Sequence, residues 1–108
     1  MSDDSLESLM AEYRRSFPDK AAAIRTAADA ARQAGWTGDA LIELASLVHK
    51  LAGSAGAYGY ADIHQQAAAL NRKLKPLVEA ASQAISETEQ SLLREEIDAL
   101  VGSLIENA

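Results

Sequence analysis

The chain has 108 residues, a length typical of one domain with a single hydrophobic core. Its formal net charge of −6 argues against nucleic-acid binding, because nucleic-acid-binding proteins concentrate positive charge. The sequence contains no cysteine, which excludes disulfides and thiolate metal sites. No apolar run reaches the roughly 20 residues needed to cross a bilayer, and the N-terminus lacks the basic and apolar regions of a signal peptide. We therefore expect a cytoplasmic protein that binds neither nucleic acid nor membrane.

Apolar residues recur at helical spacing along the chain, and no segment shows the two-residue alternation of a β-strand. Aromatic residues make up only 5% of the sequence, so aliphatic side chains and alanine must fill the core. The predicted fold class is therefore all-α.

The first two helices are separated by a proline. Leu6, Met10, Tyr13 and Phe17 share one face of the first helix. That helix should end before Pro18, because proline disfavours helical geometry in its predecessor. Pro18 is well suited to open the second helix, which is rich in alanine and should stop at Gly35.

The third and fourth helices have the clearest apolar stripes. The third is predicted from about Asp39 to Tyr58, with Gly59 supplying the left-handed residue that ends it. Its apolar stripe consists of Leu41, Leu44, Ala45, Val48, Leu51, Ala52 and Ala55. In the fourth helix, Pro76 should kink or weaken the last turns. The fourth stripe consists of Ile63, Ala67, Leu70, Leu74 and Leu77.

Ser86 and Glu89 have the form of a capping box that opens a fifth helix. The residues expected to be buried in this helix are Leu92 or Leu93, Ile97, Leu100, Val101, Leu104 and Ile105. Short connections between long amphipathic helices favour antiparallel neighbours, so residues 18–108 are predicted to form an antiparallel up-and-down four-helix bundle. Residues 1–17 form an additional N-terminal helix that packs on one end, and the whole chain, 1–108, is one domain.

His49 is the strongest candidate for a chemical role. Two glycines, Gly53 and Gly56, follow it in the same predicted helix, although an interior glycine costs about 1 kcal/mol relative to alanine. The helical periodicity places His49 at the edge of the buried face. The residues on its solvent side are Ile42, Ser46, Gly53 and Ala57. We expect this bare surface to dock a partner protein, with Gly53 clearing the approach and Gly56 permitting close packing behind the imidazole of His49.

A histidine of this kind can be a metal ligand or a nucleophile. A metal site is disfavoured, because the only other histidine is His64 and there is no cysteine or tight acidic cluster. His64 is instead expected to be a solvated residue of the fourth helix. A neutral imidazole has a lone pair that can accept a phosphoryl group and pass it on, if donor and acceptor stabilise the charge. Nothing near His49 resembles a P-loop or an acidic Mg²⁺ pocket, so we expect no nucleotide site and no intrinsic cofactor.

The string from His49 to Gly59 resembles the motif of histidine-containing phosphotransfer (HPt) domains of two-component phosphorelays. The family pattern is a histidine, a lysine or small residue three positions later, a glycine at four, small residues next, and a glycine at ten. Ala52, Gly53 and Gly59 stand at these three positions here. The resemblance covers most of the chain from about Pro18 onward, and it implies a four-helix bundle with the phosphorylated histidine midway along one helix.

The resemblance further implies a phosphorelay intermediate that has no ATP site of its own. His49 would exchange a phosphoryl group with the aspartate of a response-regulator receiver domain, or receive it from a hybrid histidine kinase, with Mg²⁺ held by the receiver. A monomer is expected. Family members often have lysine where this chain has Ala52, so Lys50 is proposed as a supporting cation, with Arg72 or Lys73 of the fourth helix as further candidates. In an antiparallel hairpin that turns near Gly59, Asn71 is the expected polar neighbour of the imidazole.

Two other interpretations compete with this one. The phosphoacceptor domain of a sensor histidine kinase normally has an acidic residue directly after the histidine and a proline a few positions on. Here Lys50 follows the histidine and no proline comes before Pro76, which argues against that class. A non-catalytic helical adaptor that binds a receiver or kinase stays open as the alternative.

Overall fold

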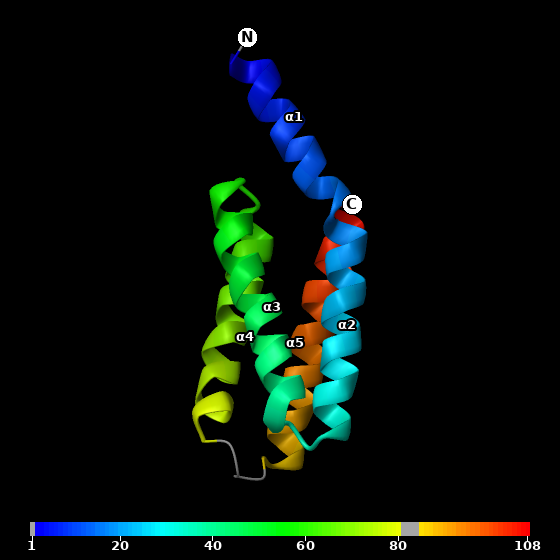
Figure 1. The fold of residues 1–108 in the computed structure, drawn as a ribbon, viewed down its shortest axis with the longest axis vertical. Helices are drawn as coiled ribbons and strands as arrows, with labels where there is room; N and C mark the ends of the chain where they lie inside the picture. Colours follow the sequence, from blue (N-terminus) through cyan, green and yellow to red (C-terminus); the bar gives the residue numbers. More distant parts are fainter. Residues whose placement is uncertain (1, 81–84) are drawn as a thin grey trace.

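The computed structural model of the protein describes residues 2–80 and 85–108. Over these residues it consists of helices without any strand, which confirms the predicted all-α class. The helices are α1 (Ser2–Arg15), α2 (Phe17–Gln33), α3 (Gly38–Ala57), α4 (Ala61–Glu79) and α5 (Glu87–Glu106). Helices α2 to α5 lie together as a bundle, and α1 extends away from one end of it (Figure 1).

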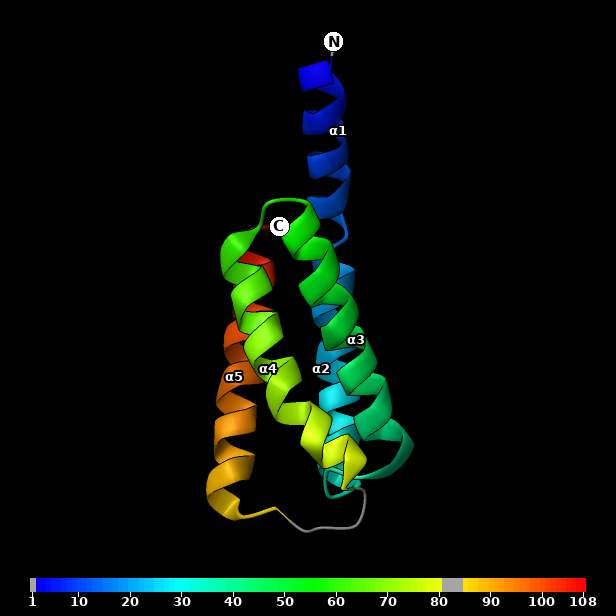
Figure 2. The same cartoon turned by 90° about the vertical axis from the view of Figure 1, so that its left-hand side faces the viewer.

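The bundle helices form a ring in which each helix contacts two others. The contacting pairs are α2 with α3, α3 with α4, α4 with α5, and α2 with α5. In Figure 1, α2 and α4 run down the view while α3 and α5 run up it. Because of this order of contacts, the α3–α4 contact lies on the opposite side of the ring from the α2–α5 contact, and Figure 2 looks onto the α3–α4 side.

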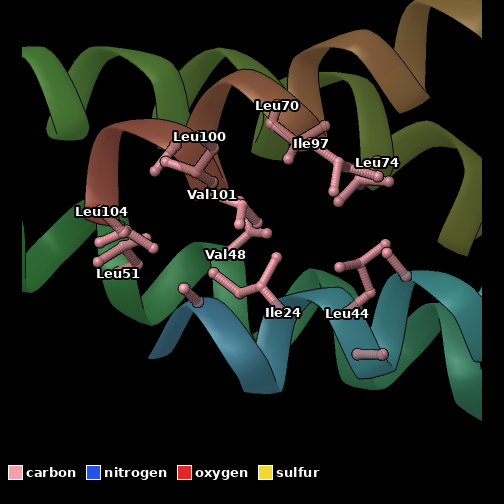
Figure 3. Close-up of a cluster of buried hydrophobic side chains, with 14 of the residues drawn as sticks. Ile24, Leu44, Val48, Leu51, Leu70, Leu74, Ile97, Leu100, Val101 and Leu104 are labelled. Atoms are coloured by element: carbon pink, nitrogen blue, oxygen red, sulfur yellow. The ribbon is translucent and has the colours of Figure 1, made fainter. Parts of the chain in front are cut away.

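The core consists of aliphatic side chains from all four bundle helices (Figure 3). The residues labelled there point toward one another: Ile24, Leu44, Val48, Leu51, Leu70, Leu74, Ile97, Leu100, Val101 and Leu104. Full burial of a leucine or isoleucine side chain stabilises the fold by about 1.5–3 kcal/mol relative to exposure. No polar or charged residue is buried in the described ranges.

The predicted apolar stripes are correct with few exceptions. Ala45 and Leu77 are only half-buried. In α5, Leu93 is buried whereas Leu92 is exposed. The prediction that Ile105 is buried is wrong, because it is 59% exposed in the last turn of α5, on a face that no other helix covers.

Helices α2 and α3 end in the same hydrogen-bonded motif. Gly35 (φ +71°) and Gly59 (φ +82°) are both left-handed, as the predicted helix ends require. The amide of Trp36 donates to the carbonyl of Ala31 at 2.7 Å, and that of Tyr60 donates to Ala55 at 2.9 Å. These are the 6→1 bonds of Schellman motifs, and they satisfy carbonyls at the helix ends.

Trp36 is unusual because its backbone is also left-handed, with φ +61°. A bulky residue adopts this conformation only where the surroundings compensate for the strain. The Trp36 side chain is 2% exposed, so burial of its indole provides that compensation.

The remaining helix boundaries follow local chemistry. Helix α2 begins at Phe17, one residue earlier than predicted, with Ser16 at its N-cap and Pro18 in its first turn. Phe17 is completely buried, so it belongs to the bundle rather than to α1. Helix α4 continues through Pro76 to Glu79. The hydroxyl of Ser86 accepts a hydrogen bond from the Glu89 amide at 3.1 Å, which confirms the predicted N-cap of α5.

Helix α1 is held to the bundle by its last turn. The ring of Tyr13 stacks on that of Tyr58 with 4.4 Å between centroids, and it meets the edge of Phe17 at 5.3 Å. The hydroxyls of Tyr13 and Ser54 lie 2.5 Å apart. The part of α1 that precedes Tyr13 extends away from the bundle (Figure 2), and its Leu6 and Leu9 are exposed. The expectation that the first helix packs on one end therefore applies to its last turn, because no second helix lies alongside its apolar face.

Candidate functional site

His49 lies near the middle of α3, with its side chain exposed. The neighbouring Val48 is completely buried and Ala52 is 8% exposed, so core packing holds this segment of backbone in place. The imidazole is therefore carried on a rigid helix while remaining accessible to a partner.

Asn71 of α4 is the polar neighbour of this imidazole. Its amide Nδ2 lies 3.4 Å from Nδ1 of His49, where hairpin geometry predicted a contact. In this orientation Nδ2 donates to Nδ1, and the ring proton of the neutral imidazole is then on Nε2. A half-turn of the amide would place Oδ1 in the same position, where it could accept the Nδ1 proton. That orientation leaves the lone pair of Nε2 free, so the amide of Asn71 can select the tautomer.

The two glycines of α3 have different surroundings. A Cβ atom built on Gly53 would meet no atom within 4 Å, so the surface one turn after His49 is open. A Cβ atom on Gly56 would lie 3.0 Å from Nδ1 of His64. Gly56 thus permits close packing, but against the ring of His64 on α4 and not behind His49 as predicted.

His64 is not simply a solvated residue. Its Nδ1 lies 2.7 Å from the carbonyl oxygen of Ala52, so the imidazole donates a hydrogen bond from α4 to the backbone of α3. The residue as a whole is still exposed. Helical spacing does not show this contact, because it depends on which side chain of the facing helix lies opposite Gly56.

The predicted docking residues lie along one exposed face of α3. Ile42 is 52% exposed, and Gly53 and Ala57 are also exposed. Ser46 is partly buried, so it contributes less surface than expected. Around His49 this face is mostly apolar and few side chains protrude from it, which suits contact with another protein surface.

The structure separates the candidate cations. Lys50 lines the groove between α2 and α3, together with Lys20, whereas Asn71 approaches His49 from α4 on the other flank of α3. Lys73 forms an ion pair with Glu96 of α5 at 2.7 Å, so it is directed away from His49. Arg72 directly follows Asn71 and is exposed. Of the three cations considered, Arg72 is the one that directly follows Asn71, the residue in contact with the imidazole. In the described residues it forms no ion pair with α5.

Over residues 2–80 and 85–108, no three His, Asp or Glu side chains lie close enough together to hold a metal ion. In the same ranges, no helix is long and apolar enough to cross a membrane.

His49 is thus an exposed imidazole midway along one helix of a four-helix ring, with an open glycine one turn later. The family model of the Hpt domain matches residues 8–103. The chain belongs to the Hpt family. Hpt domains mediate histidine phosphotransfer in two-component phosphorelays and interact with response regulators or histidine kinases. Neither the curated proteins nor the solved structures gave a significant match.

Proposed function

We propose that this Hpt domain is a phosphorelay intermediate in which His49 carries the phosphoryl group to and from the aspartate of a response-regulator receiver domain. The observation that supports this most directly is the exposed imidazole of His49, oriented by Asn71 beside the open surface at Gly53. A hybrid histidine kinase is an equally suitable phosphoryl donor for the same site.

In the proposed transfer, the lone pair of Nε2 attacks the phosphorus of the receiver's aspartyl phosphate. The N–P bond forms while the bond from phosphorus to the carboxylate oxygen breaks, and the carboxylate leaves with the electron pair. The proton on Nδ1 stays on the ring. After the amide of Asn71 turns, this N–H donates a hydrogen bond to Oδ1. Transfer to a second receiver runs through the same steps in reverse.

The charge of the transferred group must be stabilised mostly by the partner. We assign Mg²⁺ to the receiver, because the known neighbour of His49 is an amide and the adjoining surface is formed by small residues. From this chain, exposed Arg72 is the proposed cation that replaces the lysine missing at Ala52. Lys50 is proposed to meet the partner at the other edge of α3.

The contact surface for the receiver is proposed to be the exposed face of α3. Ile42 would lie at its N-terminal end as an apolar anchor, while Gly53 and Ala57 allow the receiver's aspartate to come close to the ring. The donor and the acceptor both react with the same imidazole, so they must bind in turn.

The assignment is tested by incubating the protein with a phosphorylated receiver domain. Wild type should become labelled with the acid lability of phosphohistidine, and His49→Gln should not. His64→Gln is the matched control, since it removes the only other histidine and should still become labelled. Labelling of His49→Gln would overturn the assignment. Receiver binding by the wild type without any transfer would favour the adaptor alternative.

A further inference from the structure

A second polar site lies between α2 and α5, on the side of the helix ring opposite the α3–α4 contact. It is a pocket of about 240 Å³. Ala28 and Ile97 provide its apolar part, and the other lining residues are charged except for Trp36. The pocket therefore shares no residue with the surface around His49.

The charges in this pocket are unusual for such an acidic chain. Three arginines (Arg25, Arg32 and Arg94) and two aspartates (Asp29 and Asp98) line it, so positive charge is in excess where the whole chain carries −6. Arg25 and Asp98 are 3.4 Å apart, and Arg32 and Asp29 are 3.9 Å apart. Arg94 has no ion pair with any residue in the described ranges. One guanidinium is thus available and two others are held only by long, exposed pairs.

Trp36 adds a neutral hydrogen-bond donor. Because this residue is 2% exposed, it forms the floor of the pocket and not its rim. Its Nε1 is buried and has no hydrogen-bond acceptor among the described residues. Buried N–H groups in proteins nearly always have an acceptor, so an unpaired indole N–H in a residue that lines this arginine-containing pocket requires an explanation.

We propose that this pocket binds a small oxyanion of the phosphate or carboxylate type. Arg32 and Arg94 would hold its charge from α2 and α5, since guanidinium groups match the geometry of such oxygens. The indole Nε1 of Trp36, which is covered in the free protein, would donate to the anion once the neighbouring side chains of the pocket move aside. The bound anion joins α2 to α5, so it stabilises the folded bundle, and the His49 surface stays free for a receiver.

The test uses Trp36 as the reporter, because it is the only tryptophan of the chain. Inorganic phosphate and succinate are titrated separately into ¹⁵N-labelled protein at constant ionic strength, with sodium chloride as the reference. A saturable shift of the indole N–H signal is expected with at least one of the two anions, and the arm that saturates identifies the class. Shifts that remain linear and equal in all three salts would overturn the proposal.

Variants distinguish a built site from a general salt effect. Arg94→Gln and Arg32→Gln should each weaken binding by at least about tenfold, because each removes a charge-assisted hydrogen bond. Arg15→Gln is the control, since it removes an exposed arginine of α1 away from the pocket. Trp36→Phe keeps an aromatic ring at the floor of the pocket but removes the indole N–H donor. We expect this variant to bind the anion more weakly, which calorimetry measures. Both arginines are exposed, so the two variants should fold like the wild type. If Arg94→Gln and Arg32→Gln bind the anion with the same affinity as the wild type, the proposed site is wrong.

Discussion

The amide of Asn71 on α4 lies 3.4 Å from Nδ1 of His49 on α3, so two neighbouring helices orient one imidazole. This contact joins the chemical residue to the ring of helices rather than to a loop. It also makes the protonation of the ring depend on which end of the amide faces Nδ1. The nucleophilic tautomer requires the oxygen there, and this requirement can be tested directly.

Replacing Asn71 by leucine should slow phosphoryl transfer to His49 by about tenfold, because the ring loses the partner that holds its tautomer and orientation. Asn71→Asp provides an acceptor only, so the neutral ring should keep its proton on Nδ1. The ¹⁵N chemical shifts of the imidazole report the tautomer, and transfer from a phosphorylated receiver reports the rate. If Asn71→Leu transfers as fast as the wild type, Asn71 has no positioning role.

Gly53 offers a way to separate stability from docking. Gly53→Ala should raise the free energy of unfolding by up to about 1 kcal/mol, because its Cβ meets no atom within 4 Å and alanine is the better helix former. Gly53→Leu should keep most of that gain but slow transfer, since its side chain covers the approach to His49. Thermal unfolding and transfer rates are measured on both variants. A large loss of stability in Gly53→Ala would show that Gly53 has a packing role.

Helical spacing predicted most of the core because each bundle helix buries one continuous stripe of small and aliphatic residues. The same reasoning located Asn71, since the register of a tight hairpin is fixed by its turn at Gly59. The contact between Gly56 and His64 was missed, because a helical wheel gives a direction but not the side chain that faces it. Ile105 was assigned to the core for a related reason: periodicity continues to the end of α5, but the neighbouring helices do not cover that face.

The pocket lined by Trp36 was equally hidden from sequence reasoning. Trp36 and Arg94 are far apart in the sequence and meet only because α2 and α5, the first and last helices of the ring, lie side by side. The left-handed backbone of Trp36 could not be predicted either, because this conformation is rare in bulky residues.

Gly56 should respond to substitution differently from Gly53. The Cβ of Gly56→Ala would lie 3.0 Å from Nδ1 of His64, so the ring must shift and its hydrogen bond to Ala52 is weakened. A hydrogen bond contributes about 0.5–1.5 kcal/mol, so this weakening offsets at least part of the gain in helix propensity. Gly56→Ala should therefore be less stable than Gly53→Ala, with transfer unchanged. Equal stabilisation of the two variants in thermal unfolding would show that the His64 contact contributes nothing.

The contact of Tyr13 that holds α1 to the bundle should weaken at alkaline pH. Burial of Tyr13 raises its pKa above the ordinary 10.0, although its hydrogen bond with Ser54 acts in the opposite direction. The folded chain therefore holds the phenolic proton more tightly than the unfolded chain does. Its contribution to stability is complete below the unfolded pKa and is lost as the pH rises through the folded pKa.

Tyr13→Phe isolates this contribution, because it keeps the stacked ring and removes the proton. The variant should be less stable than the wild type at neutral pH by about 0.5–1.5 kcal/mol, the net value of one hydrogen bond. Above pH 10.0 the difference in the free energy of unfolding between the two proteins should shrink. Only the wild type has the Tyr13 phenol, whose ionisation destabilises the fold. Thermal unfolding of both proteins across this range measures the difference, and tyrosinate absorbance follows the ionisation. A difference that is the same at neutral and alkaline pH would mean that the Tyr13 hydroxyl does not anchor α1.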